Sequence, residues 1–153
     1  MSKAHTNGAD TRNVAVREAT GDFVLWVDSD DLLMPGAIAA HRAAMRDYPA
    51  ADVYYGNLKV FGDTRRFPSA EVLYDDFWGR TAYLRHRLVS HNRVPQPGTA
   101  VRRALYTRVG GYDPAFVRAH DYEFWTRAVD HATFKHVSAF TCLWRWHSSN
   151  MSS

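Results

Sequence analysis

Three carboxylates follow directly after an apolar run near the beginning of the chain. Residues 23–27 are all apolar, and Asp28, Asp30 and Asp31 come next, interrupted only by Ser29. Carboxylates this close repel one another, and a bound cation relieves the repulsion. They suit Mg²⁺ or Mn²⁺ that also carries a phosphorylated substrate, because these ions prefer carboxylate, phosphate and water. The spacing therefore predicts a divalent-metal site, with an acidic turn that caps the next helix as the alternative.

Residues 23–27 are predicted to form the strand that positions these acids. A short apolar run with β-branched and aromatic members, bounded by Gly21 and by charge, is typical of a strand buried on both faces in the middle of a parallel sheet. In open α/β sheets, ligands bind beyond the carboxyl ends of the strands. We therefore expect Asp28, Asp30 and Asp31 at a ligand-binding edge.

The composition indicates one well-packed domain. The 153 residues are 46% hydrophobic and 14% aromatic, which excludes a disordered chain and allows a substantial core. No apolar stretch approaches the roughly 18 residues that a membrane span needs. We expect a single domain over residues 1–153, without a recognisable linker or repeat.

The cysteine content indicates the cellular compartment, and the charge limits the classes of partner. Cys142 is the single cysteine, which excludes an internal disulfide and agrees with a reducing compartment. Residues 1–6 are polar and are not expected to be a signal peptide. The net charge of +3 comes without a basic stripe, which argues against nucleic-acid binding. We expect a cytoplasmic protein, with peripheral attachment to the inner face of the membrane left open.

Helices and strands are expected to alternate, as in α/β folds. Asn7 is suited to an N-cap and Pro35 to the first turn of a helix. The last helix is expected to bury Phe124, Trp125 and Ala128. We expect helices at residues 8–20, 35–47, about 105–109 and from 121 onward, and strands at residues 51–56, 58–61, 99–101 and 135–146.

Residues 67–94 give the weakest local signals. Val72, Leu73, Phe77 and Trp78 recur at helical spacing and predict a helix. A further short helix is expected over residues 83–88.

Several short motifs occur in one order across nearly the whole chain. They are Asn7-Gly8 with Thr11-Arg12-Asn13; Ala19-Thr20-Gly21-Asp22; Asp28-Ser29-Asp30-Asp31 with Pro35; Gln96-Pro97-Gly98 with Arg102-Arg103; Val109-Gly110-Gly111-Tyr112-Asp113; His120-Asp121-Tyr122-Glu123-Phe124-Trp125-Thr126-Arg127; and Trp144-Arg145-Trp146-His147 with Asn150 and Ser152. Together they resemble the inverting GT-A fold glycosyltransferases of sequence family 2. The resemblance implies an α/β, Rossmann-like, partial GT-A fold with a mixed sheet flanked by helices.

The resemblance also implies a nucleotide-diphosphate sugar as donor. Asp28 would then hold the ribose or base side of the nucleotide, and Asp30 would ligate the Mg²⁺ or Mn²⁺ that bridges the diphosphate. Asp31 and Gly111 fall among the expected substrate-binding positions. Arg12 matches a position that contacts the nucleotide, and an exposed helical arginine is its alternative. The acceptor would be a glycan, a lipid-linked or another hydroxyl compound, in bacterial polysaccharide or cell-wall synthesis.

Asp121 occupies the place of the family's catalytic base. It would take a proton from the acceptor hydroxyl while that oxygen attacks the anomeric carbon, and a single displacement inverts the configuration. A base must lie within hydrogen-bond reach of that hydroxyl. The alternative is that Asp121 only caps the helix that it begins, since helix N-termini favour Asp.

Two histidines also lie at motif positions. His120 stands where the family usually has Glu, so it is expected to tune the base or to contact the acceptor. His147 falls where related enzymes often place a C-terminal His near the diphosphate or metal. Its alternative is a structural or surface histidine beside Trp144 and Trp146.

The sequence departs from the family at its start. The family has a nucleotide-binding strand and helix before the Asn-Gly motif, and here only six residues precede Asn7. On the order of 60 to 90 residues of sheet are expected to be absent, because a βαβ unit takes about 30 or more. The strand at residues 23–27 would then have an unpaired edge. We expect weak nucleotide binding by this chain alone, and self-association or a partner chain that completes the sheet.

Two other functions stay open at this point. A truncated or degenerate glycosyltransferase could act as a non-catalytic binding module. A phosphatase of the haloacid dehalogenase type also begins with an apolar strand and Asp-x-Asp, here Asp28 as nucleophile and Asp30 as acid. That family needs a small pair after the second Asp, whereas Asp31-Leu32 stands here.

Overall fold

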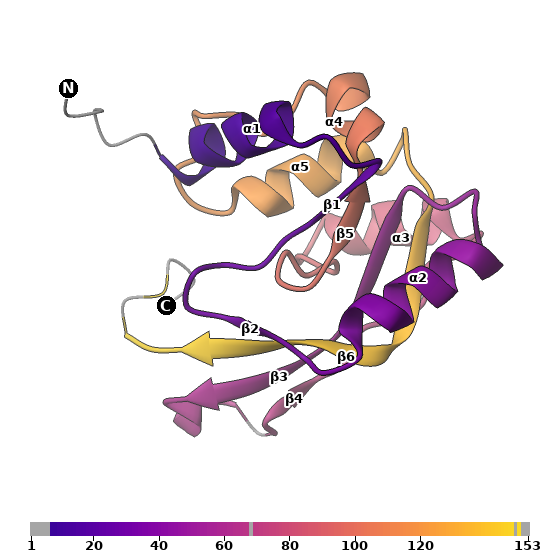
Figure 1. Ribbon diagram of the computed structural model, residues 1–153. Coiled ribbons are helices and arrows are strands. Elements are labelled where there is room, and N and C mark those ends of the chain that lie inside the picture. Colours follow the sequence, from indigo (N-terminus) through magenta and orange to yellow (C-terminus); the bar gives the residue numbers. More distant parts are fainter. Residues whose placement is uncertain (1–6, 68, 149, 151–153) are drawn as a thin grey trace.

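The computed structural model describes residues 7–67, 69–148 and 150, which form a six-stranded sheet with helices around it (Figure 1). The strand order is β1-β5-β3-β6-β2, and β4 pairs with β3 outside this path. The elements are α1 Gly8–Glu18, β1 Phe23–Leu25, β2 Leu32–Leu33, α2 Ala37–Asp47, β3 Val53–Gly62, η1 Thr64–Arg66, β4 Glu71–Val72, α3 Thr81–Leu88, β5 Ala100–Arg102, α4 Arg103–Val109, α5 His120–Ala128 and β6 Phe134–Trp146.

The centre of the sheet is the parallel pair β3 and β6, and all other strand pairs are antiparallel. This confirms the expected mixed sheet. The strands expected at residues 51–56 and 58–61 are one strand, β3, whose register against β6 shifts around Asn57. Gly56 permits this irregularity, because a Cβ there would lie 2.3 Å from Cγ2 of Thr141.

The strand at residues 23–27 does not lie in the middle of a parallel sheet, but among the described residues it has the unpaired edge that was also expected. β1 ends at Leu25 and lies at one end of the strand order, and within the described part of the chain it pairs only with β5, in antiparallel register. Its three residues are half-buried. Trp26 extends the pairing through bonds from its N to O of Thr99 and from N of Gly98 to its O. An apolar run therefore identified a strand, but not its number of neighbours.

Local capping signals placed α1 correctly. The side chain of Asn7 accepts a hydrogen bond from N of Asp10, as expected of an N-cap, and the helix ends at Glu18, before Gly21. α2 begins two residues after Pro35, because Gly36 adopts a left-handed conformation at its N-cap. No helix in the described part of the chain is both long and apolar enough to cross a membrane.

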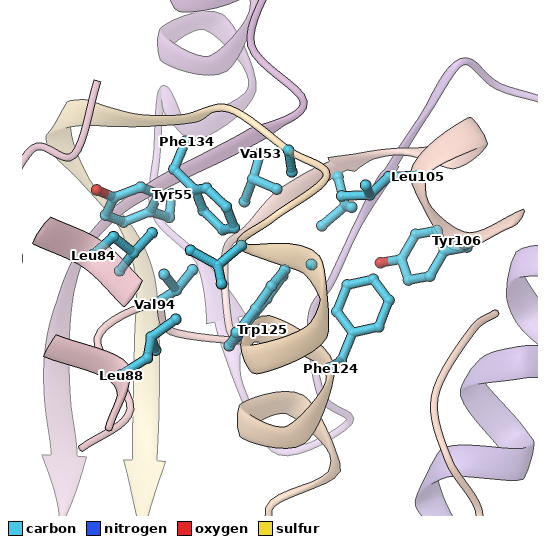
Figure 2. Packing of buried hydrophobic residues seen from close by; sticks show 14 of the residues in the cluster. Val53, Tyr55, Leu84, Leu88, Val94, Leu105, Tyr106, Phe124, Trp125 and Phe134 are labelled. Carbon is cyan, nitrogen blue, oxygen red and sulfur yellow. The ribbon is translucent and has the colours of Figure 1, made fainter. Parts of the chain in front are cut away.

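The main hydrophobic core lies between α5, α3, α4 and one side of the sheet (Figure 2). Trp125 of α5 is fully buried and packs edge-on against Phe134 of β6. Phe124 and Ala128 are buried with it, which confirms the predicted face of this helix. Packing in this core holds α5 in place. Figure 1 shows α1 next to α5.

The helix predicted around residues 72–78 is absent from the structure. Val72 lies in β4, and the chain then runs without regular structure to the turn at residues 78–79. Side chains of β3 hold this segment: Tyr55 Oη donates to O of Asp75 at 2.6 Å, and N of Tyr74 donates to Oδ1 of Asn57 at 3.0 Å. The short helix expected over residues 83–88 is confirmed as α3.

Candidate active site

A cleft of about 360 Å³ lies where α1, the turn after β1 and the start of α5 meet. It is lined by Arg12, Asp28, His120 and Asp121, and by Asn92, which bonds to Asp121. The structure therefore brings together four residues that the sequence had marked as site candidates. Asp28 and Asp121 share one cleft although 93 residues separate them along the chain.

Arg12 and Asp28 form an ion pair at this cleft. The Arg12 side chain is only 11% exposed, and its guanidinium lies 5.7 Å from the centre of the Trp26 ring. The alternative of an exposed helical arginine is therefore wrong. Arg12 places positive charge against the carboxylate from the fold's first strand, while the Asp28 side chain stays 40% exposed.

Asp30 and His147 meet from distant parts of the chain. His147 Nε2 lies 3.0 Å from Oδ2 of Asp30, and both side chains are a little more than one-third exposed. Arg145 holds the same turn, because its Nε donates to the Asp30 carbonyl at 3.0 Å. Asp30 follows β1 and His147 follows β6, so pairing of β6 with β2 brings them together.

The donor set of Asp30 and His147 fits a divalent cation that a substrate helps to hold. Among the described residues, no group of three or more His, Cys, Asp or Glu side chains could hold a metal by itself. A carboxylate oxygen suits Mg²⁺ or Mn²⁺, whose shell phosphate or water oxygens complete, whereas imidazole is the more usual ligand of Zn, Cu, Fe and Ni. The pair would therefore hold the metal only as part of a larger shell.

Asp31 does not line the cleft. It is buried, and its Oδ1 accepts a hydrogen bond from N of Arg145 at 2.8 Å. Burial raises the pKa of Asp31 to about 6, the charges of Asp28 and Asp30 add to this, and the bond from Arg145 opposes it. The contacts that the structure gives Asp31 stabilise the packing of the acidic turn against β6.

Asp121 lies in the first turn of α5. Its Oδ2 accepts a hydrogen bond from Nδ2 of Asn92 at 2.9 Å. The N-cap position belongs to Ala119, which makes no side-chain capping bond. Asp121 is therefore not the N-cap residue, although it lies in the first turn of the helix, where a negative charge is favourable.

His120 is buried beside Asp121. Burial is the main cause that lowers the pKa of His120, and the positive charge of Arg12 lowers it further, against the charges of Asp121 and Asp28. Its ring packs edge-on against Tyr112 at 5.7 Å between centres. His120 therefore contributes a neutral imidazole to the cleft wall rather than a cation.

Gly111 lies away from this cleft, in a second hollow of about 350 Å³ beside α4 and α5. Its φ is 75°, and a Cβ there would lie 2.7 Å from Oδ1 of Asn13. The Gly111 carbonyl accepts a hydrogen bond from Nη2 of Arg127. The backbone at Gly111 thus has no room for a side chain beside Asn13 of α1 and is bonded to α5 through Arg127, and the structure does not bring it to the cleft.

The sequence pattern of glycosyl transferase family 2 matches residues 3–110. The chain belongs to glycosyltransferase family 2. This membership supports the glycosyltransferase prediction over the phosphatase alternative. The matched part contains the acidic turn from Asp28 to Asp31, whereas Asp121 and His147 lie beyond it.

Two curated relatives of this family 2 chain carry the same general description. An uncharacterized glycosyltransferase of Bacillus subtilis, YwdF, is 26% identical over 137 residues, which are 87% of this chain and 48% of the relative. An uncharacterized glycosyltransferase of Haemophilus influenzae is 21% identical over 140 residues, 87% of this chain and 44% of the relative. The chain thus spans about half the length of these relatives.

Solved structures show the same fold. The crystal structure of residues 1–349 of Staphylococcus aureus TarS in complex with UDP-GlcNAc has a TM-score of 0.74 and 20% identity, and the match covers all of this chain and 43% of that one. A second TarS structure without that ligand in its description gives a TM-score of 0.67, with 19% identity over 95% and 42% of the two chains. The likeness confirms the partial GT-A fold.

Sequence reasoning missed several residues of the cleft in this family 2 chain. Asn92, Tyr74 and Trp144 line it beside the predicted residues. Asn92 and Tyr74 come from the segment between β3 and β5 where no periodicity was informative. Their positions depend on distant partners such as Asn57, so a local pattern could not have identified them.

Proposed function

We propose that this chain is part of a glycosyltransferase that moves a sugar from a nucleotide-diphosphate sugar to an acceptor hydroxyl with inversion. The observation that carries the proposal is that Asp28 and Asp121 line one cleft. One carboxylate comes from the turn after β1 and the other from the start of α5. A donor and an acceptor can meet between two such groups.

Asp121 is the proposed base. The acceptor oxygen attacks the anomeric carbon, its proton passes to the Asp121 carboxylate, and the bond from that carbon to the diphosphate oxygen breaks. The electron pair of the broken bond stays on the departing nucleotide diphosphate. A single displacement of this kind inverts the configuration at the anomeric carbon. His120 is neutral and buried beside Asp121, so it does not compete as a cation for the carboxylate.

The donor is proposed to lie against Arg12, Asp28 and the Asp30–His147 pair. Asp28 would bind hydroxyl groups of the nucleotide, and its ion pair with Arg12 holds it in place. Asp30 and His147 would hold Mg²⁺ or Mn²⁺, which when bound neutralises charge on the leaving diphosphate. The TarS structure holds UDP-GlcNAc, and we take a UDP-sugar as the first donor to test. The acceptor is proposed to be a glycan, a lipid-linked or another hydroxyl compound.

The test compares Asp121→Asn with the unchanged chain. Asparagine keeps the shape of the side chain and cannot take a proton, so we expect transfer and hydrolysis of the UDP-sugar to fall at least about 100-fold. Donor affinity, measured by calorimetry with Mn²⁺, should stay within about twofold. The control is Asp47→Asn, an exposed acid at the end of α2 that pairs with Arg46.

Two outcomes would reject the proposal. An Asp121→Asn variant with the full rate would show that another group is the base. Binding of UDP-sugar by the unchanged chain without any turnover would favour a non-catalytic binding module instead.

A further inference from the structure

Asn92 connects Asp121 to the segment that follows α3. Its Oδ1 accepts a hydrogen bond from N of Val94 at 3.2 Å, and its Nδ2 donates to Oδ2 of Asp121 at 2.9 Å. A backbone N–H can only donate, so the bond from Val94 fixes which end of the amide is the oxygen. The other end, Nδ2, then has to face Asp121.

The segment that carries Asn92 is anchored by buried contacts. Val94 is fully buried in the main core. Oγ1 of Thr99 donates to O of Pro95 at 2.5 Å, and Nε2 of Gln96 donates to Oη of Tyr112 at 2.9 Å. The Asn92 side chain is itself exposed, and the residues that follow it from Val94 onward are packed in the protein.

We propose that Asn92 is a positioning residue that orients the Asp121 carboxylate in the cleft. This inference rests on the proposed function, in which Asp121 is the base. A donor on Oδ2 favours the charged carboxylate, because a hydrogen bond to the anion stabilises it. It also holds the carboxylate plane, so that Oδ1 is the oxygen that receives the proton. Asn92 acts through Asp121 and takes no proton itself.

The decisive variant is Asn92→Asp. Its carboxylate can still accept from N of Val94, so the local turn is kept, while the donor to Asp121 is replaced by a second negative charge. We expect kcat to fall about 10- to 100-fold at pH 8, as for loss of a hydrogen bond to a charged group. KM for the UDP-sugar should stay within about twofold, because Asn92 does not act on the donor.

The pH profile separates positioning from a merely structural role. Two touching carboxylates share one proton. When the carboxyl group introduced by Asn92→Asp carries that proton, it becomes a donor to Asp121, so the rate should recover as the pH is lowered. Asn92→Ala lacks any group at this position and should be slow at every pH. Ser90→Asp adds the same charge to the same segment and should keep kcat within about twofold.

The carboxyl-carbon NMR signal of Asp121, identified with Asp121→Asn, reports the contact at constant pH without turnover. Its chemical shift at pH 8 should change in Asn92→Ala, and an unchanged chemical shift would overturn the contact. Full rate in Asn92→Asp at pH 8, or a slow rate that does not recover at lower pH, would overturn the positioning role while leaving the proposed function intact. Absence of turnover in the unchanged chain would instead reject the proposed function, and the positioning role with it.

Discussion

His147 Nε2 lies 3.0 Å from Oδ2 of Asp30, across 117 positions of the chain. The pairing of β2 with β6 places the two residues on neighbouring strand ends, with Leu32 opposite Leu143. A carboxylate and an imidazole at this distance can share one cation. The structure thus brings together the two residues, Asp30 and His147, that the resemblance implied for a metal site, and metal binding there stays a prediction.

Replacing His147 by Ala should weaken divalent-metal binding. Losing one of two protein ligands leaves Asp30 with phosphate and water, so we expect the Mn²⁺ concentration for half-saturation, in the presence of UDP, to rise about 10-fold or more. Electron paramagnetic resonance of free Mn²⁺ measures this without turnover. His131→Ala removes an exposed imidazole elsewhere and serves as the control. Equal Mn²⁺ affinity in all three proteins would exclude His147 as a ligand.

His41 makes the fold sensitive to acid. It is buried in α2, and its Nε2 lies 2.9 Å from O of Gly98, which can only accept, so Nε2 carries a hydrogen. Burial lowers the pKa of His41 below 6.5, although the Gly98 carbonyl opposes the shift. Above pH 6.5 the ring is neutral in both states. As the pH falls below 6.5, His41 is protonated in the unfolded chain before it is protonated in the folded chain. The free energy of unfolding therefore decreases as the pH is lowered.

The His41→Gln variant should lose part of this acid sensitivity. Glutamine keeps an N–H donor and does not titrate, so the slope of the free energy of unfolding below pH 6.5 should decrease by up to about 1.4 kcal/mol per pH unit. Urea unfolding at several pH values measures the slope. The pKa values of His120 and His136 are also lowered by burial, so some slope should remain. His91→Gln, at an exposed position, is the control, and the same slope in His41→Gln as in the unchanged chain would contradict the argument.

Local signals predicted the helices that carry the site. Asn7 marked the start of α1, and the apolar face of α5 was predicted correctly. These features depend on neighbours within one or two turns. The order of motifs added the partial GT-A fold, which no single local feature contains.

Features that depend on distant partners were not predictable in the same way. Apolar residues 23–27 indicated burial, yet the position of β1 in the strand order depends on β5, about 75 residues later. The spacing of Val72 and Phe77 suggested a helix, while bonds from Tyr55 and Asn57 hold that segment in an irregular conformation. Asn92 reached the cleft for a similar reason, because its bond partner lies 29 residues further along the chain.

Ala119 holds a strained backbone next to the proposed base. It has φ 54°, and among the described residues no other residue besides glycine has a positive φ. Its carbonyl accepts from N of Glu123 at 3.0 Å, so this conformation is built into the start of α5. A left-handed conformation costs a residue with a Cβ about 1–2 kcal/mol, and glycine avoids this cost at the expense of about 0.5–1 kcal/mol of chain entropy.

Ala119→Gly should therefore raise the free energy of unfolding by about 0.5–1 kcal/mol. Ala119→Val should lower it by more than that, because a β-branched side chain is poorly tolerated at positive φ. Urea unfolding of the three proteins measures both effects. The two variants should move in opposite directions only if the left-handed conformation persists in solution. Stabilisation by valine would show that Ala119 has relaxed, and that His120 and Asp121 then start α5 from a different backbone geometry.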